Sequence, residues 1–233
     1  MADQVANNAA SRPPSWPMYR ALVGVGVVCG LLIVSVFVLT LPIIASNEAE
    51  ALQAAVFEVL PGASSKTSFV LDADGHFRPV REGDNPQQMV HVGYDTDGSL
   101  VGVAIPAQGM GYQDVIRILY GYAPQQQIVV GMQVLASKET PGLGDKIEKD
   151  PAFRANFEAL DVALSADGQS LAHPVEAVKS GAKTAPWQVD GITGATISSK
   201  AIASILRHSG AHWLPLLYPR RAELAQGGGD DGQ

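Results

Sequence analysis

The stretch Asp190–Ile202 reads Asp-Gly-Ile-Thr-Gly-Ala-Thr-Ile-Ser-Ser-Lys-Ala-Ile, and the rest of the chain is expected to be organised around it. Its centre, Thr193–Thr196, places a hydroxyl after two residues with almost no side chain, so a bulky phosphorylated group can approach the backbone closely. Ser198 and Ser199 are good helix caps, and apolar residues then recur at helical spacing. A phosphate on Thr196 would lie near free N–H groups at the positive end of a helix dipole. The alternative is an ordinary loop and helix cap, because short motifs often arise by chance.

A second stretch, Glu139–Ile147, reads Glu-Thr-Pro-Gly-Leu-Gly-Asp-Lys-Ile and directly follows a segment that is expected to be a strand. Its proline and two glycines exclude regular secondary structure. A loop in this place is often a functional site, because loops carry binding residues on a rigid scaffold. The alternative is a plain surface turn.

Together the two stretches resemble the FMN-binding domain family. In that family the sequence Asp-x-x-Ser/Thr-Gly-Ala-Thr is the flavinylation motif, and its last Thr carries FMN through a phosphoester. The matching residue here is Thr196, and the earlier motif positions are Asp190, Thr193, Gly194 and Ala195. The stretch Glu139–Ile147 matches a second signature of the same family, in the expected order and at the expected separation.

The resemblance implies covalent FMN, attached to Thr196 by a separate Mg-dependent flavin transferase that uses FAD. It implies no catalytic side chain and no metal site, because the redox chemistry belongs to the flavin ring. The loop with Gly142 and Gly144 is expected to fold against that ring, with glycines where backbone approaches the flavin or takes a positive φ. The expected cofactor-binding residues are Thr196, Asp190, Thr193, Gly194, Ala195, Ser198, Glu139, Thr140, Pro141, Gly142, Leu143 and Gly144.

Within the family, the chain is most similar to the G subunit of Rnf-type electron transport complexes. This implies an electron-relay subunit of a membrane-bound, ion-translocating oxidoreductase that is linked to ferredoxin and NAD, with other membrane subunits as partners. The C-type subunit of the sodium-pumping NADH:quinone oxidoreductase, or another membrane-anchored flavin protein, is the alternative. Gln113-Asp114 and Pro124–Gln127 depart from the family pattern, which leaves the type of complex open but not the flavin.

Two functions of other classes are weaker alternatives. An independent flavin reductase would need a second redox site or a donor module, which this short chain does not visibly supply. A membrane-anchored binding or sensory domain would need no flavin at all, and a protein that stays colourless beside an active flavin transferase would favour it.

An N-terminal transmembrane helix is predicted at residues 21–45. The segment Ala21–Ile44 carries no charge and spans about 36 Å as a helix, enough to cross a bilayer. A cleaved signal peptide is the alternative, although its apolar run would be shorter, about 7 to 15 residues. Pro42 is expected to help end the helix, and Gly26 with Gly30 has the spacing of a helix-packing face.

The flanking charges predict the orientation. Arg12 and Arg20 precede the span, whereas Glu48 and Glu50 follow it, and basic residues stay on the cytoplasmic side. The amino terminus should therefore be cytoplasmic and the domain extracytoplasmic, on the periplasmic side of a bacterial inner membrane. Residues after 45 contain 14 basic and 22 acidic residues, which argues against binding nucleic acid or anionic lipid. As the only cysteine, Cys29 excludes an internal disulfide or a cysteine-ligated iron–sulfur cluster.

An α+β fold is expected, with a mainly antiparallel sheet flanked by helices. The expected parts are a cytoplasmic stub (1–20), the transmembrane helix (21–45), an FMN-binding domain (46–220) and a flexible tail (221–233). Asp95–Gly98 is a hairpin turn, and so short a link requires antiparallel pairing. Runs rich in Val, Ile, Tyr and Phe predict strands at Ser68–Asp72, Gln88–Tyr94, Leu100–Ile105, Val115–Tyr122 and Ile128–Leu135.

Three further side-chain groups have both a functional and an ordinary interpretation. His208 and His212 share a helix face, but no third ligand follows at helical spacing, so a solvated helix end is expected. Trp187 could stack on a flavin or belong to the core or its edge. Lys146 could neutralise a reduced flavin or be ordinary surface charge.

Overall fold

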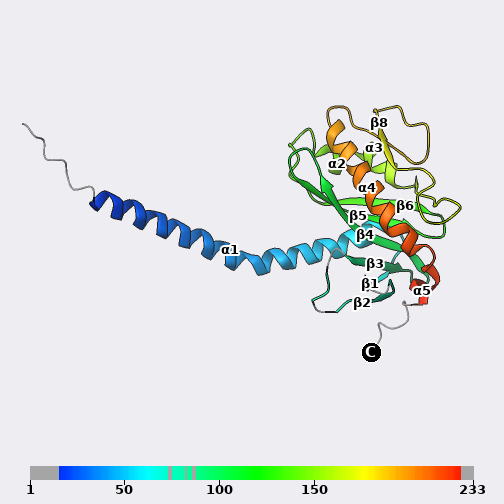
Figure 1. Ribbon diagram of the computed structural model, residues 1–233, viewed down its shortest axis with the longest axis horizontal. Coiled ribbons are helices and arrows are strands. Elements are labelled where there is room, and N and C mark those ends of the chain that lie inside the picture. Colours follow the sequence, from blue (N-terminus) through cyan, green and yellow to red (C-terminus); the bar gives the residue numbers. More distant parts are fainter. Residues whose placement is uncertain (1–15, 73–74, 82, 86–87, 227–233) are drawn as a thin grey trace, which may run out of the picture. The chain divides into compact units, whose positions relative to one another are not determined.

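The computed structural model describes residues 16–72, 75–81, 83–85 and 88–226 (Figure 1). Most of the predicted cytoplasmic stub and the last seven residues of the predicted tail lie outside the described residues. The chain divides into two units, residues 1–50 and 51–233, and each is considered by itself.

A single helix, α1 (Trp16–Val59), forms the described part of the first unit and continues into the second. It is long and apolar enough to cross a membrane, by length and composition. The prediction that Pro42 helps to end the helix is wrong, because Pro42 lies inside α1. Thr40, two residues before Pro42, donates hydrogen bonds to the carbonyls of Val36 and Phe37, at 2.9 and 3.0 Å.

The second unit is built on a seven-stranded sheet of order β2-β1-β3-β4-β5-β6-β7, in which all neighbours are antiparallel. The five predicted strands are confirmed, and the Asp95–Gly98 turn joins β3 to β4 through a bond from Gly98 N to Asp95 O. The strands of the sheet are β1 (Ser65–Leu71), β2 (Phe77–Pro79), β3 (Met89–Tyr94), β4 (Leu100–Met110), β5 (Val115–Ala123), β6 (Ile128–Ala136) and β7 (Leu160–Asp161).

Short elements connect this sheet to the long helix α4 (Thr196–Leu217), and the α+β prediction is therefore confirmed. A parallel pair of strands, β8 (Glu176–Val178) and β9 (Gln188–Asp190), precedes the loop before α4. The remaining elements are α2 (Lys146–Lys149), α3 (Pro151–Arg154), η2 (Ala155–Phe157) and α5 (Arg221–Gln226). In α5, Leu224 is buried and its carbonyl accepts a 2.7 Å hydrogen bond from the Tyr94 hydroxyl.

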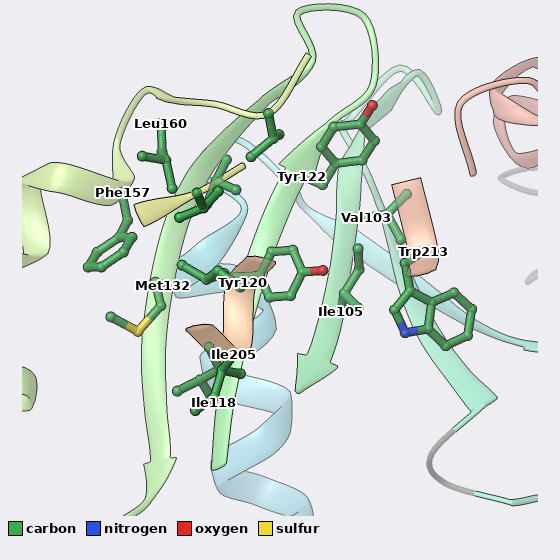
Figure 2. Packing of buried hydrophobic residues seen from close by; sticks show 14 of the residues in the cluster. Val103, Ile105, Ile118, Tyr120, Tyr122, Met132, Phe157, Leu160, Ile205 and Trp213 are labelled. Atoms are coloured by element: carbon green, nitrogen blue, oxygen red, sulfur yellow. The ribbon is translucent and has the colours of Figure 1, made fainter. Parts of the chain in front are cut away.

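The main core lies between one face of the sheet and α4 (Figure 2). Side chains alternate along β4 and β5, so Ile105 and Ile118 point to this face. Ile205 and Trp213 of α4 cover them. The position of α4 against the sheet places its first residue, Thr196, at the edge of the core.

The opposite face of the sheet receives the last turns of α1 through a glycine channel, made of Gly93, Gly102, Gly121 and Gly131. Gly93 pairs with Gly102 and Gly121 pairs with Gly131, whereas Gly121 lies opposite Ala104 on β4, so the glycines lie on four neighbouring strands. A Cβ on any of the four would lie closer than 3.0 Å to another atom, and on Gly121 that atom would be the Val59 carbonyl oxygen. The channel lets the end of α1 pack directly on the sheet backbone.

Candidate functional site

Thr196 is the first residue of α4 and is exposed to solvent. Gly194 has a φ of 86°, a left-handed conformation that glycine adopts without strain, and Ala195 is the buried N-cap residue. Ala195 has no side-chain oxygen, and no side-chain cap hydrogen bond is formed at this end of α4. The first N–H groups of the helix therefore stay available to an acceptor near Thr196. Thr193 and Gly194 are also exposed.

The prediction that Ser198 and Ser199 cap the helix is wrong, because both lie inside the first turn of α4 and are buried. The Ser199 hydroxyl donates to the carbonyl of Ala195 at 2.9 Å and accepts from the N–H of Ile192 at 3.1 Å. This pair of bonds closes the loop before Thr196 on itself. The serines are therefore buried residues inside the helix that hold the loop before Thr196, and they do not cap the exposed end of the helix.

Glu139 brings the two sequence motifs together. Its side chain is buried and accepts a 2.5 Å hydrogen bond from the Ser198 hydroxyl. Its other carboxyl oxygen accepts from the backbone N–H groups of Tyr112 and Gln113, at 2.7 and 3.2 Å. The loop after β6, the turn between β4 and β5, and the first turn of α4 consequently meet at one side chain.

The two glycines of the Glu139–Gly144 loop are each required for a different structural reason. Gly142 has a φ of 78° and open space around it, so its conformation requires glycine. Gly144 is buried, and a Cβ there would lie 2.6 Å from Glu139 Oε2 and 3.0 Å from Ser198 Oγ. Thr140 accepts a 3.2 Å bond from the Gln113 side-chain amide. Pro141 and Leu143 are exposed.

Asp190 organises the segment that leads into the motif. Its carboxyl group accepts from the N–H groups of Gly181 and Ala182, at 3.0 and 3.3 Å. Its backbone N–H and C=O are both bonded by the side chain of Asn156, at 2.9 and 3.2 Å. Sequence reasoning missed Asn156, because nothing in a lone asparagine 34 residues away signals that it will bracket this backbone.

Exposed apolar side chains lie beside the motif that contains Thr196. Tyr112, Leu143 and Ile197 are 61, 51 and 56% exposed, and Ile197 follows Thr196 directly. A Cβ on Gly194 would lie 3.9 Å from Leu143 Cδ2, which places Leu143 beside the motif. Among the described residues after 50, the exposed large apolar side chains are all found in these segments. They are Met110, Tyr112, Val115, Leu143 and Ile197, and they are called the apolar patch below.

Charged side chains border this region. Lys138 contacts Asp114 at 2.5 Å, and this hydrogen bond lowers the pKa of the Asp114 carboxyl group. Lys149 contacts Asp145 at 2.7 Å and lowers the pKa of Asp145 in the same way. Lys146 begins α2 and is half-buried.

The other candidates have ordinary partners. Trp187 stacks on His173 with ring centres 3.8 Å apart, and the His208 ring contacts the carbonyl of Ser204 at 2.7 Å. Within the part of the chain that the structure describes, no group of three or more His, Cys, Asp or Glu side chains could hold a metal ion.

Comparison with known proteins identifies the domain. Residues 111–209 match the family model of the FMN-binding domain. The G subunit of the ion-translocating oxidoreductase complex of Methanosarcina acetivorans is 32% identical over 170 residues, which cover 72% of this chain and 77% of that protein. The G subunit of the proton-translocating ferredoxin:NAD(+) oxidoreductase complex of Clostridium ljungdahlii is 29% identical over 175 residues, which cover 75% of this chain and 78% of that protein.

The fold is shared with a solved structure. The C subunit of the Na(+)-translocating NADH-quinone reductase of Parabacteroides distasonis aligns with a TM-score of 0.57 at 20% identity, covering 74% of this chain and 94% of that one. The predicted resemblance is thus confirmed. The chain contains an FMN-binding domain and belongs to the family of G subunits of ion-translocating oxidoreductase complexes.

Proposed function

We propose that this chain is an electron-relay subunit that carries FMN through a phosphoester bond to Thr196. The observation that carries the proposal is an exposed threonine at the first position of a 22-residue helix whose N-terminus has no side-chain cap. A phosphate on the Thr196 oxygen would accept hydrogen bonds from the first-turn N–H groups and lie at the positive end of the helix dipole. Gly194 and Ala195 leave space for the phosphate, and the Thr193 hydroxyl would help to position it.

The apolar patch supports a flavin in this place. Tyr112, Leu143 and Ile197 offer apolar surface within the site, where an aromatic ring tethered at Thr196 could be covered on one side. The loop from Glu139 to Gly144 would border the ring through Leu143, with Thr140, Pro141 and Gly142 shaping it. FMN supplies reversible electron uptake when bound, and the chain's part is to hold it while leaving an edge open to partner subunits.

Attachment would be made by a separate, Mg-dependent flavin transferase that uses FAD. The Thr196 oxygen forms a bond to the phosphorus of the FMN half, and the bond between the two phosphates of FAD breaks. AMP leaves, and the hydroxyl proton is released, so no oxidation or reduction is involved. Mg²⁺ would neutralise charge on the transferring phosphate. Thr196 is thus an acceptor and not a catalyst.

The partners would be the other membrane subunits of an Rnf-type complex. Relatives named as G subunits of ion-translocating complexes, one of them a ferredoxin:NAD(+) oxidoreductase, support this assignment. A C-type subunit of a sodium-pumping NADH:quinone oxidoreductase is the second candidate, supported by the shared fold.

Purification of the native membrane complex through a tag on this chain tests the assignment. We expect one FMN per copy of the chain, together with several integral membrane subunits whose sequences identify the type of complex. A chain that purifies alone and oxidises a soluble donor without partners would contradict the relay function and favour an independent reductase.

The orientation can be tested separately. Arg12 and Arg20 precede the span, and the next basic residue is Lys66, so the amino terminus should lie in the cytoplasm. A reporter that is active only outside the cytoplasm, fused after Tyr218, is expected to be active. The same reporter fused to the amino terminus is the control and should be silent. A reporter that is silent after Tyr218 and active at the amino terminus would overturn the extracytoplasmic location of the domain.

A further inference from the structure

Glu139 is a buried carboxyl group that the proposed attachment chemistry does not use. It accepts three hydrogen bonds, all from uncharged donors: one from the Ser198 hydroxyl and two from the N–H groups of Tyr112 and Gln113. The donors lie 59, 27 and 26 residues away in sequence. Burial of a carboxyl group is costly unless it is well bonded, so the three bonds define one arrangement of these segments.

Two glycines enclose this carboxyl group. A Cβ on Gly111 would clash with Glu139 Oε1, and a Cβ on Gly144 would lie 2.6 Å from Glu139 Oε2. The backbone therefore lies so close to both carboxyl oxygens that only glycine, which has no Cβ, fits at these two positions. The glycines of two separate segments are explained by the same carboxyl group, which indicates a site built around Glu139.

We propose that Glu139 is a positioning residue for flavin attachment, an inference that rests on the proposed function. Ser198 lies two residues after Thr196 in the same helical turn, so the bond from its hydroxyl fixes the rotation of that turn. The bonds to Tyr112 and Gln113 fix the same carboxyl group to the turn between β4 and β5. The Thr196 oxygen is thereby held in one place before the transferase arrives.

Loss of the carboxyl group should slow attachment more than it unfolds the chain. In Glu139→Ala the Ser198 hydroxyl and two N–H groups lose their acceptor, and the first turn of α4 is released. Group transfer depends on alignment, and a displacement of about 1 Å costs on the order of 100-fold in rate. We expect the rate of covalent flavin uptake to fall on the order of 10- to 100-fold.

The experiment uses the full chain in detergent, with purified flavin transferase, FAD and Mg²⁺. Initial rates of covalent uptake are read from flavin fluorescence of the denatured band. Hydrogen–deuterium exchange of the chain before flavin attachment is measured on peptides that cover 111–114 and 195–199, and both should exchange faster in Glu139→Ala. Glu158→Ala, at an exposed glutamate outside the site, is the matched control and should keep the wild-type rate and exchange.

Glu139→Gln separates positioning from charge. Its amide oxygen can still accept from Tyr112 and Gln113, and its NH₂ group can donate to the Ser198 hydroxyl. We expect it to restore slow exchange and most of the uptake rate. Suppose instead that the Gln variant exchanges as slowly as wild type but takes up flavin as slowly as the Ala variant. Glu139 would then act through its charge or its proton, and the positioning role would be overturned.

Three further results would also test the positioning role of Glu139. If Glu139→Ala does not fold, Ser198→Ala removes only one hydroxyl and should slow uptake, and a wild-type rate there would contradict the proposal. A Glu139→Ala chain that is flavinylated as fast as wild type would overturn it too. A wild-type chain that takes up no covalent flavin would contradict the proposed function, while the exchange data would still test the hydrogen bonds of Glu139.

Discussion

Replacing Thr196 by Val is expected to abolish covalent flavin while the domain keeps its fold. Valine has nearly the size and shape of threonine but lacks the oxygen that would form the phosphoester. Thr196 is exposed at the start of α4, so the added methyl group enters no packed region and stability should change by no more than about 0.5 kcal/mol. In-gel flavin fluorescence after denaturation, from cells that make the flavin transferase, measures the result.

Thr193→Val is the matched control for that substitution. Thr193 is also exposed and lies in the same loop, three residues before Thr196, but its hydroxyl can only assist positioning. We expect reduced but measurable labelling. A fluorescent band that persists in Thr196→Val and disappears in Thr193→Val would move the attachment to Thr193, and a band that persists in both would remove it from this motif.

Replacing Gly121 by Ala is expected to destabilise the FMN-binding domain strongly. Gly121 lies in the glycine channel, where a Cβ would clash with the backbone carbonyl oxygen of Val59. The Cβ is attached directly to the backbone of β5 and the oxygen belongs to the backbone of α1. Neither can move aside as a flexible side chain can, so the end of α1 or strand β5 must shift. Overpacking of this kind costs about 3 kcal/mol, or a fall in Tm of about 6–12 °C for a domain of this size.

Thermal unfolding of the full chain in detergent, followed by near-ultraviolet circular dichroism, measures this effect. Gly210→Ala is the control, because a Cβ at Gly210 would meet its neighbours at 3.8–3.9 Å, an ordinary contact. Gly210 is in the helix α4, where alanine is favoured over glycine by about 0.5–1 kcal/mol, so this variant should be as stable as wild type or more so. Equal melting temperatures for the two variants would show that α1 does not pack in the glycine channel.

The sequence by itself predicted the local structure and the identity of the domain. Runs rich in Val, Ile, Tyr and Phe determined the five central strands, because β-branched and aromatic side chains pack well on a pleated, half-buried surface. The turn at Asp95–Gly98 followed from the conformations that aspartate and glycine tolerate. The two motifs, Glu139–Ile147 and Asp190–Thr196, identified the FMN-binding family because both are short, contiguous segments.

Only the tertiary structure decided how these local pieces meet. Pro42 and the two serines after Thr196 read as helix-ending and helix-capping residues, yet Pro42 lies within α1, while Ser198 bonds Glu139 from inside α4. Ser198 finds an acceptor inside the fold because the buried carboxyl group of Glu139 lies within hydrogen-bond distance of it.

The glycine channel and the hydrogen bonds of Glu139 have the same physical origin. Gly121 and Gly144 carry no local signal that separates them from turn glycines, and their neighbours in space, Val59 and Ser198, lie more than 50 residues away in the chain. A sequence pattern reports the conformation that each segment prefers. Which backbone atoms approach too closely for a Cβ, and which acceptor a buried hydroxyl finds, depend on contacts between distant segments, and these exist only once the sheet has assembled.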